Sequence, residues 1–237
     1  MDGSAQPAAK KTMRPRDAAT LVLCDRARGN LSVLMGKRHE RHKFMPGKFV
    51  FPGGAVEPAD RKMSIAGPLD EIVEQKLLAR TRRSSPEFAR GLALAAIRET
   101  FEETGLAVGV TDVGAPEETP NEAWAHFAAT GVFPTLDGLD FLARAITPPG
   151  RPRRFDARFF IADASLIARE VPGVVGAEAE FVELAWMKLE TALELDLPNI
   201  TRNVLGILAA LGEGPHDRFR PRPFFHRIGN RWLNDEL

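Results

Sequence analysis

The chain has 237 residues, a formal net charge of zero, 44% hydrophobic and 27% charged residues. These are ordinary values for a globular protein, and balanced charge excludes a global field that would attract nucleic acid or an anionic membrane. The sequence also has no apolar run of membrane-spanning length, and its single cysteine, Cys24, excludes an internal disulfide framework. We therefore expect a cytoplasmic protein with no nucleic-acid or membrane partner.

The N-terminal part of the chain predicts a leader followed by strands. Met1 to Asp17 is polar and basic, which predicts a disordered leader. Ala18 to Cys24 and Leu31 to Met35 are short apolar runs separated by turn-forming residues, which predicts a β-hairpin. Lys48 to Phe51 predicts a further short strand that leads into a pair of glycines.

Two helices are predicted next. Residues 68–83 combine apolar residues at helical spacing with many charges, which predicts a surface helix laid over the core. Ser85 is a favoured N-cap residue and Pro86 suits the first helical position, so a second helix is predicted from Pro86 to Thr104. Its apolar residues recur at i, i+3 and i+7 and predict a buried stripe made of Leu94, Ile97 and Phe101.

The remaining sequence predicts a mixture of helices and strands. Helices are predicted at 121–129, 136–146 and 198–211, and strands at 158–162 and 181–187. Strands arranged around one long helix suit a mixed sheet between helical layers, which is an α/β fold.

Three carboxylates near the end of the second predicted helix are the most informative feature. Glu99, Glu102 and Glu103 stand at relative positions i, i+3 and i+4, so they share one helix face. Like charges at this spacing weaken a helix, and a compensating cation is therefore expected. A hard divalent ion such as Mg²⁺ prefers oxygen ligands and bridges phosphate oxygens. The alternative interpretation is a solvated acidic face.

Two segments resemble the two halves of the Nudix box. Arg98 to Leu106 is similar to the second half, Arg-Glu-U-x-Glu-Glu-x-Gly-U, where U is apolar. Phe51 to Asp60 is similar to the first half, with Gly54 as the opening glycine and Asp60 in place of a glutamate. A further departure is Thr100, which occupies an apolar position of the pattern.

The spacing of the two halves is unusual. Residues 61–97 number 37 where the pattern has 7, so about 30 residues are inserted. The resemblance implies a Nudix-type α/β/α sandwich with a mixed sheet, formed by one domain over 18–237 with an inserted helical segment at about 61–90.

The resemblance also implies a function. It implies a pyrophosphohydrolase that acts on phosphoric anhydride bonds and depends on Mg²⁺ or Mn²⁺. By this resemblance Glu99, Glu102 and Glu103 are metal ligands and catalytic residues, and the Gly54 carbonyl oxygen adds another ligand. Arg98 would orient the carboxylates through a salt bridge. The alternative for Arg98 is a plain surface ion pair with Glu102 at i+4.

The remaining candidates lie outside the box. Nudix proteins often carry an extra carboxylate before a late strand, and Glu180 is our choice of general base among Glu178, Glu180 and Glu183. Two basic segments supply phosphate-binding candidates, or are solvated loops. From these segments we select Arg38, Lys43, Arg154 and Arg158.

The substrate prediction rests on a second resemblance. Leu34 to Gly54 is similar to an additional motif of Nudix enzymes that cleave coenzyme A, although Gly36, His39 and Lys43 depart from it. The resemblance implies coenzyme A or acyl-coenzyme A as the substrate. NADH, ADP-ribose or a nucleotide sugar is the alternative within the class, and a non-catalytic nucleotide-binding module is the alternative outside it. A homodimer is compatible with the sequence.

Overall fold

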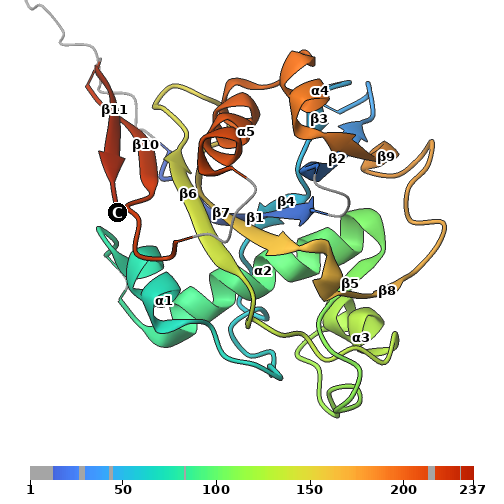
Figure 1. Cartoon of the computed structure of the whole chain (residues 1–237). Coiled ribbons are helices and arrows are strands. Elements are labelled where there is room, and N and C mark those ends of the chain that lie inside the picture. The colour runs from blue at the N-terminus through green and yellow to red at the C-terminus, as the bar shows by residue number, and fades with distance from the viewer. Residues whose placement is uncertain (1–12, 27–29, 43–44, 83, 213–216, 230) are drawn as a thin grey trace, which may run out of the picture.

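The computed structural model describes residues 13–26, 30–42, 45–82, 84–212, 217–229 and 231–237 (Figure 1). Among them, nine strands form one mixed sheet in the order β11-β10-β6-β7-β1-β2-β3, with β4 beside β1 and β9 beside β2. The strands of this sheet are β1 (Arg16–Asp25), β2 (Ser32–Arg38), β3 (Phe49–Val50), β4 (Gly53–Ala55), β6 (Asp140–Ile146), β7 (Phe155–Asp163), β9 (Phe181–Lys188), β10 (Pro223–Ile228) and β11 (Arg231–Glu236). A separate two-stranded sheet pairs β5 (Leu106–Val108) with β8 (Ile167–Glu170).

Helices cover both faces of the large sheet (Figure 1). They are α1 (Glu71–Leu78), α2 (Pro86–Thr104), α3 (Glu122–Ala128), α4 (Leu189–Glu194) and α5 (Asn199–Leu211), with a 3-10 turn, η2, at Ala164–Leu166. The structure thus has an α/β fold with a mixed sheet between helical layers, as the sequence predicted. None of the helices within the described ranges is long and apolar enough to span a membrane.

Strand β1 lies at the centre of the sheet and separates two cores. It pairs in parallel with β7 and antiparallel with β2, where Cys24 lies opposite Val33. Leu21 and Leu23 pack in the core beneath α2, whereas Val22 and Cys24 pack in the core beneath α4 and α5. Because β1 is buried on both faces, its sequence is a continuous apolar run instead of an alternating one.

The residues predicted to begin and end α2 cap the helix in the structure. The Ser85 side chain accepts a hydrogen bond from the Phe88 N–H, and Pro86 occupies the first helical position. At the other end Gly105 adopts a left-handed conformation (φ 78°), and its N–H donates to the Phe101 carbonyl oxygen. The helix therefore has the bounds predicted for it, and its position on the sheet fixes where the acidic residues lie.

The prediction of a helix over 136–146 is wrong, because residues 140–146 form strand β6. This strand pairs antiparallel with β7 and parallel with β10, and its first five residues are buried. A short apolar run buried on both sides has no periodicity that distinguishes a strand from a buried helix. The predicted helix over 68–83 is also shorter, because the Asp70 side chain caps its start and α1 ends at Leu78.

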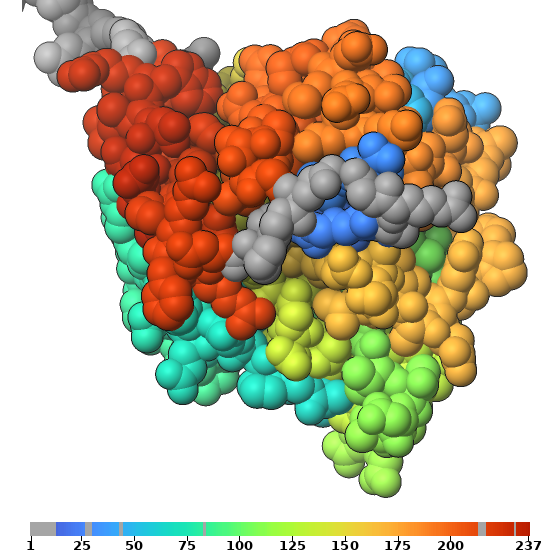
Figure 2. Space-filling view, viewed as in Figure 1, coloured from blue at the N-terminus to red at the C-terminus, as the bar shows by residue number. Residues whose placement is uncertain are grey.

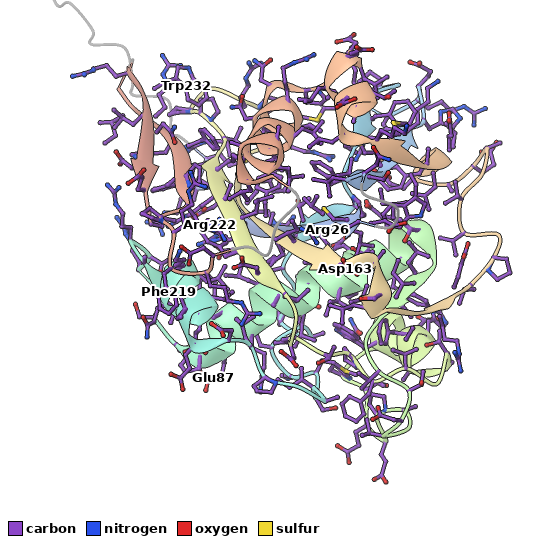
Figure 3. The ribbon with its side chains drawn as sticks, in the orientation of Figure 1. Arg26, Glu87, Asp163, Phe219, Arg222 and Trp232 are labelled. Atoms are coloured by element: carbon purple, nitrogen blue, oxygen red, sulfur yellow. The ribbon has the colours of Figure 1, made fainter. Side chains whose placement is uncertain are left out.

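The two ends of the chain also differ from the predictions. Arg16 and Asp17 belong to β1 instead of a leader, and the other predicted leader residues up to 12 lie outside the described ranges. The hairpin β10–β11 was not predicted, and it extends the sheet beside α1 (Figure 2). It is anchored by a buried ion pair in which Arg222 donates to Asp140 over 2.8 Å, whereas Trp232 of β11 is 62% exposed (Figure 3).

The reactivity of the Cys24 thiol tests whether the core beneath α5 is packed as the structure shows. The side chain has no exposed surface, and burial raises the pKa of its thiol to about 12. Since the thiolate is the reactive form, we expect the native protein to resist a thiol reagent such as DTNB at pH 8. One thiol per chain should react after unfolding in guanidinium chloride. Fast labelling of the native protein would contradict this packing.

Candidate active site

The last two turns of α2 present the three predicted carboxylates on the side away from the core. Leu94 and Ile97 are fully buried and Phe101 nearly so, which confirms the predicted stripe. Glu102 is the most exposed of the three carboxylates, at 38%, whereas Glu99 and Glu103 are partly covered. The helix is more buried than an amphipathic surface helix, because Thr100 and Thr104 are covered as well.

A buried ion pair joins the two halves of the motif. The Arg98 Nε donates to Asp60 Oδ1 over 2.7 Å and its second terminal nitrogen donates to Oδ2 over 3.1 Å. Asp60 also accepts from the Trp124 indole N–H at 3.1 Å and from the Glu57 N–H at 2.7 Å. Both charged groups are almost completely buried, at 0% and 2% exposure. All four hydrogen bonds make Asp60 the fixed point to which Arg98 is attached.

The other side of Arg98 faces the carboxylates. One terminal nitrogen donates to Glu99 Oε1 over 3.0 Å and to both carboxylate oxygens of Glu102 over 3.3 Å. Burial alone would lower the pKa of Arg98, but Asp60 and these carboxylates outweigh it and the pKa is raised. Arg98 is therefore more than a surface ion pair with Glu102, because it is held from behind by Asp60 and by the Ala55 carbonyl oxygen.

Strand β4 brings the glycine pair directly against the helix. The Gly53 N–H donates to Glu103 Oε2 over 2.9 Å. At Gly54, a Cβ atom would lie 2.4 Å from the Glu99 carboxyl carbon, so any side chain would displace Glu99. Glycine at position 54 thus allows the β4 backbone to lie close to the Glu99 carboxylate without displacing it.

The pKa values of the two carboxyl groups beside β4, those of Glu99 and Glu103, are raised. Burial, reinforced by the negative charge of Glu102, raises the pKa of Glu99 to about 7 against the opposing effect of Arg98. Burial also raises the pKa of Glu103, and the nearby Glu99 and Glu180 add to the effect. Within the described part of the chain, however, no three acidic, histidine or cysteine side chains already converge as a metal site.

Of the other predicted residues, the structure brings two to the acidic face. Arg38 and Glu180 form a salt bridge, and both act electrostatically on Glu103. His42 Nε2 lies 3.4 Å from the other Glu180 oxygen. Lys43 lies outside the described residues.

The other two predicted phosphate-binding residues lie elsewhere. Arg158 is buried on β7, where it donates to Asp17 and packs over the Phe88 ring. Phe88 is in the first turn of α2, about 16 Å along the helix from Glu99 at a rise of roughly 1.5 Å per residue. Arg154 donates to the carbonyl oxygens of Thr147 and Met13. Neither arginine is therefore brought together with the acidic face.

Sequence reasoning missed Trp124, which contacts the site through Asp60. Its indole is fully buried in α3, 64 residues from its hydrogen-bond partner. The available signal was weak, since a tryptophan in a short helix is usually a core residue. Only the packing of α3 against α2, with Trp124 and Phe101 both contacting the Phe127 ring, places it beside the motif.

Comparison with known proteins agrees with the fold and the motif. No protein-family model matches the chain. The Caenorhabditis elegans protein named "Putative nudix hydrolase 7" is 29% identical over 189 residues, covering 76% of this chain and 53% of the relative. This chain thus spans about half the length of that curated relative. The crystal structure of a Nudix hydrolase from Alicyclobacillus acidocaldarius matches with a TM-score of 0.62 and 28% identity, covering 85% of this chain and 99% of that one.

The fold is Nudix-like, and the acidic end of α2 resembles the second half of the Nudix box. The chain is thus similar in sequence and fold to Nudix hydrolases.

Substitution of Asp60 tests the buried ion pair. In Asp60→Ala the Arg98 charge would stay buried without its main partner, so we expect a loss of about 3–5 kcal/mol in the free energy of unfolding. Urea unfolding followed by circular dichroism measures the change. Asp112→Ala is the matched control, because Asp112 is exposed and should change stability by less than about 0.5 kcal/mol. Equal effects of the two substitutions would refute the structural role of Asp60.

The raised pKa of Glu99 predicts how stability depends on pH in the metal-free protein. Its folded-state pKa of about 7 exceeds the ordinary value of 4.5, so the folded state binds the proton more tightly. This contribution is fully present below pH 4.5 and is lost as the pH rises through 7, and it amounts to about 1–3 kcal/mol. Urea unfolding in EDTA between pH 5 and 8 measures it. Glu99→Gln should flatten the decrease, and an unchanged slope would argue against this assignment.

Proposed function

We propose that this chain is a metal-dependent pyrophosphohydrolase that cleaves a nucleoside diphosphate linked to another moiety. The observation that carries the proposal is the pair of partly buried carboxylates, Glu99 and Glu103, held against the glycines of β4 beside the more exposed Glu102. Buried negative charge of this kind is unfavourable without a cation. A site that binds a cation, and phosphate through that cation, would explain why this unfavourable negative charge is present.

The chemistry of the donor groups fits Mg²⁺ or Mn²⁺. Carboxylate and carbonyl oxygens are the ligands these hard ions take, and here Glu99, Glu102, Glu103 and the Gly54 carbonyl oxygen would hold them. When bound, such an ion neutralises phosphate charge and lowers the pKa of a water molecule. Because Glu102 and Glu103 now bond to Arg98 and to the Gly53 N–H, their side chains would have to rotate to meet at one ion.

Arg98 acts in this proposal as a positioning residue. Its buried guanidinium is fixed by Asp60 and donates to Glu99 and Glu102, so it limits the directions in which these carboxylates point. Contact with substrate is not its role, because only 2% of its side-chain surface is exposed.

Arg38 and Glu180 supply two further functions at the same site. Glu180 would accept a proton from an attacking water; its support is that it acts electrostatically on Glu103 and pairs with Arg38. Arg38 would bind a phosphate oxygen once substrate enters, since a guanidinium forms charge-assisted hydrogen bonds with phosphate. Arg154 and Arg158 have no part in this proposal, because the structure places them away from the acidic face.

Coenzyme A or acyl-coenzyme A is the proposed substrate. Support comes from the sequence motif that spans β2 and β4, in which Arg38 ends β2 and Gly53 and Gly54 form β4. Incubation of the purified protein with Mg²⁺ and a panel of coenzyme A, NADH, ADP-ribose and a nucleotide sugar tests this choice. Cleavage of NADH or ADP-ribose with coenzyme A intact would reject coenzyme A and keep the reaction type.

Substitution of the carboxylates tests catalysis itself. Glu103→Gln keeps the shape of the side chain but removes the charge that a cation would meet, so we expect turnover to fall roughly 100-fold or more. The same substitution at Glu102 should act in the same direction. Glu87→Gln is the matched control, because Glu87 lies in the first turn of the same helix and is exposed.

The outcome also separates an enzyme from a binding module. If the folded wild-type protein binds a nucleotide of the panel but cleaves none in Mg²⁺ or Mn²⁺, the chain is a non-catalytic module. Circular dichroism must show that the variants remain folded.

A further inference from the structure

Three parts of the chain bring arginine side chains to one end of the large sheet. Residues 13–16 lead into β1, residues 147–154 connect β6 to β7, and residues 227–229 and 231–234 lie on either side of the turn from β10 to β11. Strands β1 and β7 pair in parallel from Arg16 and Phe155, and β10 and β6 also pair in parallel. The three parts therefore share one end of the sheet, at the upper left in Figure 1.

Arg154 fastens two of these parts together. Its Nε donates to the Thr147 carbonyl oxygen over 3.0 Å, and one terminal nitrogen donates to the Met13 carbonyl oxygen over 2.6 Å. The Arg154 carbonyl oxygen in turn accepts from the Arg16 N–H over 2.9 Å. The start of β1 is therefore held against the connection between β6 and β7.

The arginines at this end of the sheet are not neutralised by acidic side chains. Residues 13–16, 147–154 and 227–234 contain seven arginines and neither aspartate nor glutamate. Asp17 and Asp156, which follow on β1 and β7, already form salt bridges with Arg158. Five of the arginines are exposed and have no ion-pair partner within the described ranges, and we call them the basic end: Arg14, Arg16, Arg151, Arg153 and Arg231.

The balanced total charge of the chain conceals this asymmetry. Because the 32 lysines and arginines equal the 32 acidic residues in number, positive charge gathered at one end leaves an excess of negative charge over the rest. The field of an exposed charge extends about 8 Å at physiological ionic strength, so the basic end acts locally. The absence of a membrane partner, which we expected from the net charge, therefore does not follow for this end.

Large apolar side chains are exposed beside the basic end. Met13 is 55% exposed, and Ile228 and Trp232 are each 62% exposed. In the β10–β11 hairpin, Ile228 lies opposite Arg231 and Trp232 lies opposite Arg227. Figure 3 shows Trp232 at this end of the molecule. Such side chains leave water when they enter the interface of a lipid bilayer, where tryptophan in particular is favoured.

We propose that the basic end docks this protein on the surface of an anionic phospholipid bilayer. The guanidinium groups form charge-assisted hydrogen bonds with the phosphates of the headgroups, while Trp232 and Ile228 enter the interface. A nucleic acid fits less well, because it offers phosphates but no apolar layer for Ile228 and Met13. A second copy of the chain would bring like charges together. The proposal is independent of the reaction proposed for the acidic face.

Co-sedimentation with vesicles tests the electrostatic part of the proposal. In EDTA and about 0.1 M NaCl, the wild type should bind vesicles of equal parts phosphatidylcholine and phosphatidylglycerol but not phosphatidylcholine alone. About 1 M NaCl should release it, because the screening length falls to about 3 Å. Arg151→Glu/Arg153→Glu should weaken binding about 30-fold or more. If circular dichroism shows that this variant is unfolded, Arg151→Ala/Arg153→Ala replaces it and should weaken binding about tenfold.

Arg169→Glu/Lys188→Glu is the matched control. It changes the net charge equally, at exposed residues of β8 and β9. Lys188 pairs with Ser32, which pairs with Asp25 at the opposite end of β1 from Arg16. We expect this variant to weaken binding less than about threefold, because the charges are screened over that distance. Equal weakening by the two double variants would overturn the proposal, since binding would then depend on net charge alone.

Tryptophan fluorescence tests whether the apolar side chains enter the bilayer. Addition of the anionic vesicles should shift the emission to shorter wavelength, and brominated phosphatidylcholine in the vesicles should quench it. Trp232→Phe should lose both effects, whereas Trp186→Phe, which replaces another exposed tryptophan on β9, should keep them. Failure of the wild type to bind the anionic vesicles would overturn the proposal. A DNA duplex that bound the basic end more tightly than the vesicles at equal salt would overturn it in favour of nucleic acid.

Discussion

The buried ion pair between Asp60 and Arg98 is the constraint on which the rest of the site depends. A guanidinium and a carboxylate removed from water are stable only when nearly all of their hydrogen-bonding groups have partners. Here Asp60 receives two bonds from Arg98 and one each from Trp124 and Glu57. The pair fixes the loop after β4, helix α3 and the end of α2 in one arrangement. The acidic face can keep its shape because its central arginine cannot move.

The second feature of the site is the close contact between backbone and carboxylate. Strand β4 approaches α2 so closely that Gly54 has no room for a side chain beside Glu99, and Gly53 donates directly to Glu103. This contact excludes water from two carboxylates and thereby raises their pKa values. Buried negative charge of this kind is unfavourable without a compensating positive charge.

The environment changes sharply at the end of α2. On one side of Glu103 lie charged groups, with Arg38 and Glu180 paired beside it. On the other side Gly105 contacts the segment that follows β8, because its carbonyl oxygen accepts a hydrogen bond from the Val171 N–H.

The sequence alone determined the features that depend on local chemistry. The caps of α2, the shared face of the three glutamates and the β1–β2 hairpin follow from residues within a few positions of each other. Only the tertiary structure decided the rest. The nature of β6 depends on pairing with β7 and β10, because a short and largely buried segment has no period that distinguishes a strand from a helix. The roles of Asp60 and Trp124 and the separation of Arg158 from the site depend on contacts between residues far apart in the chain, which no local pattern encodes.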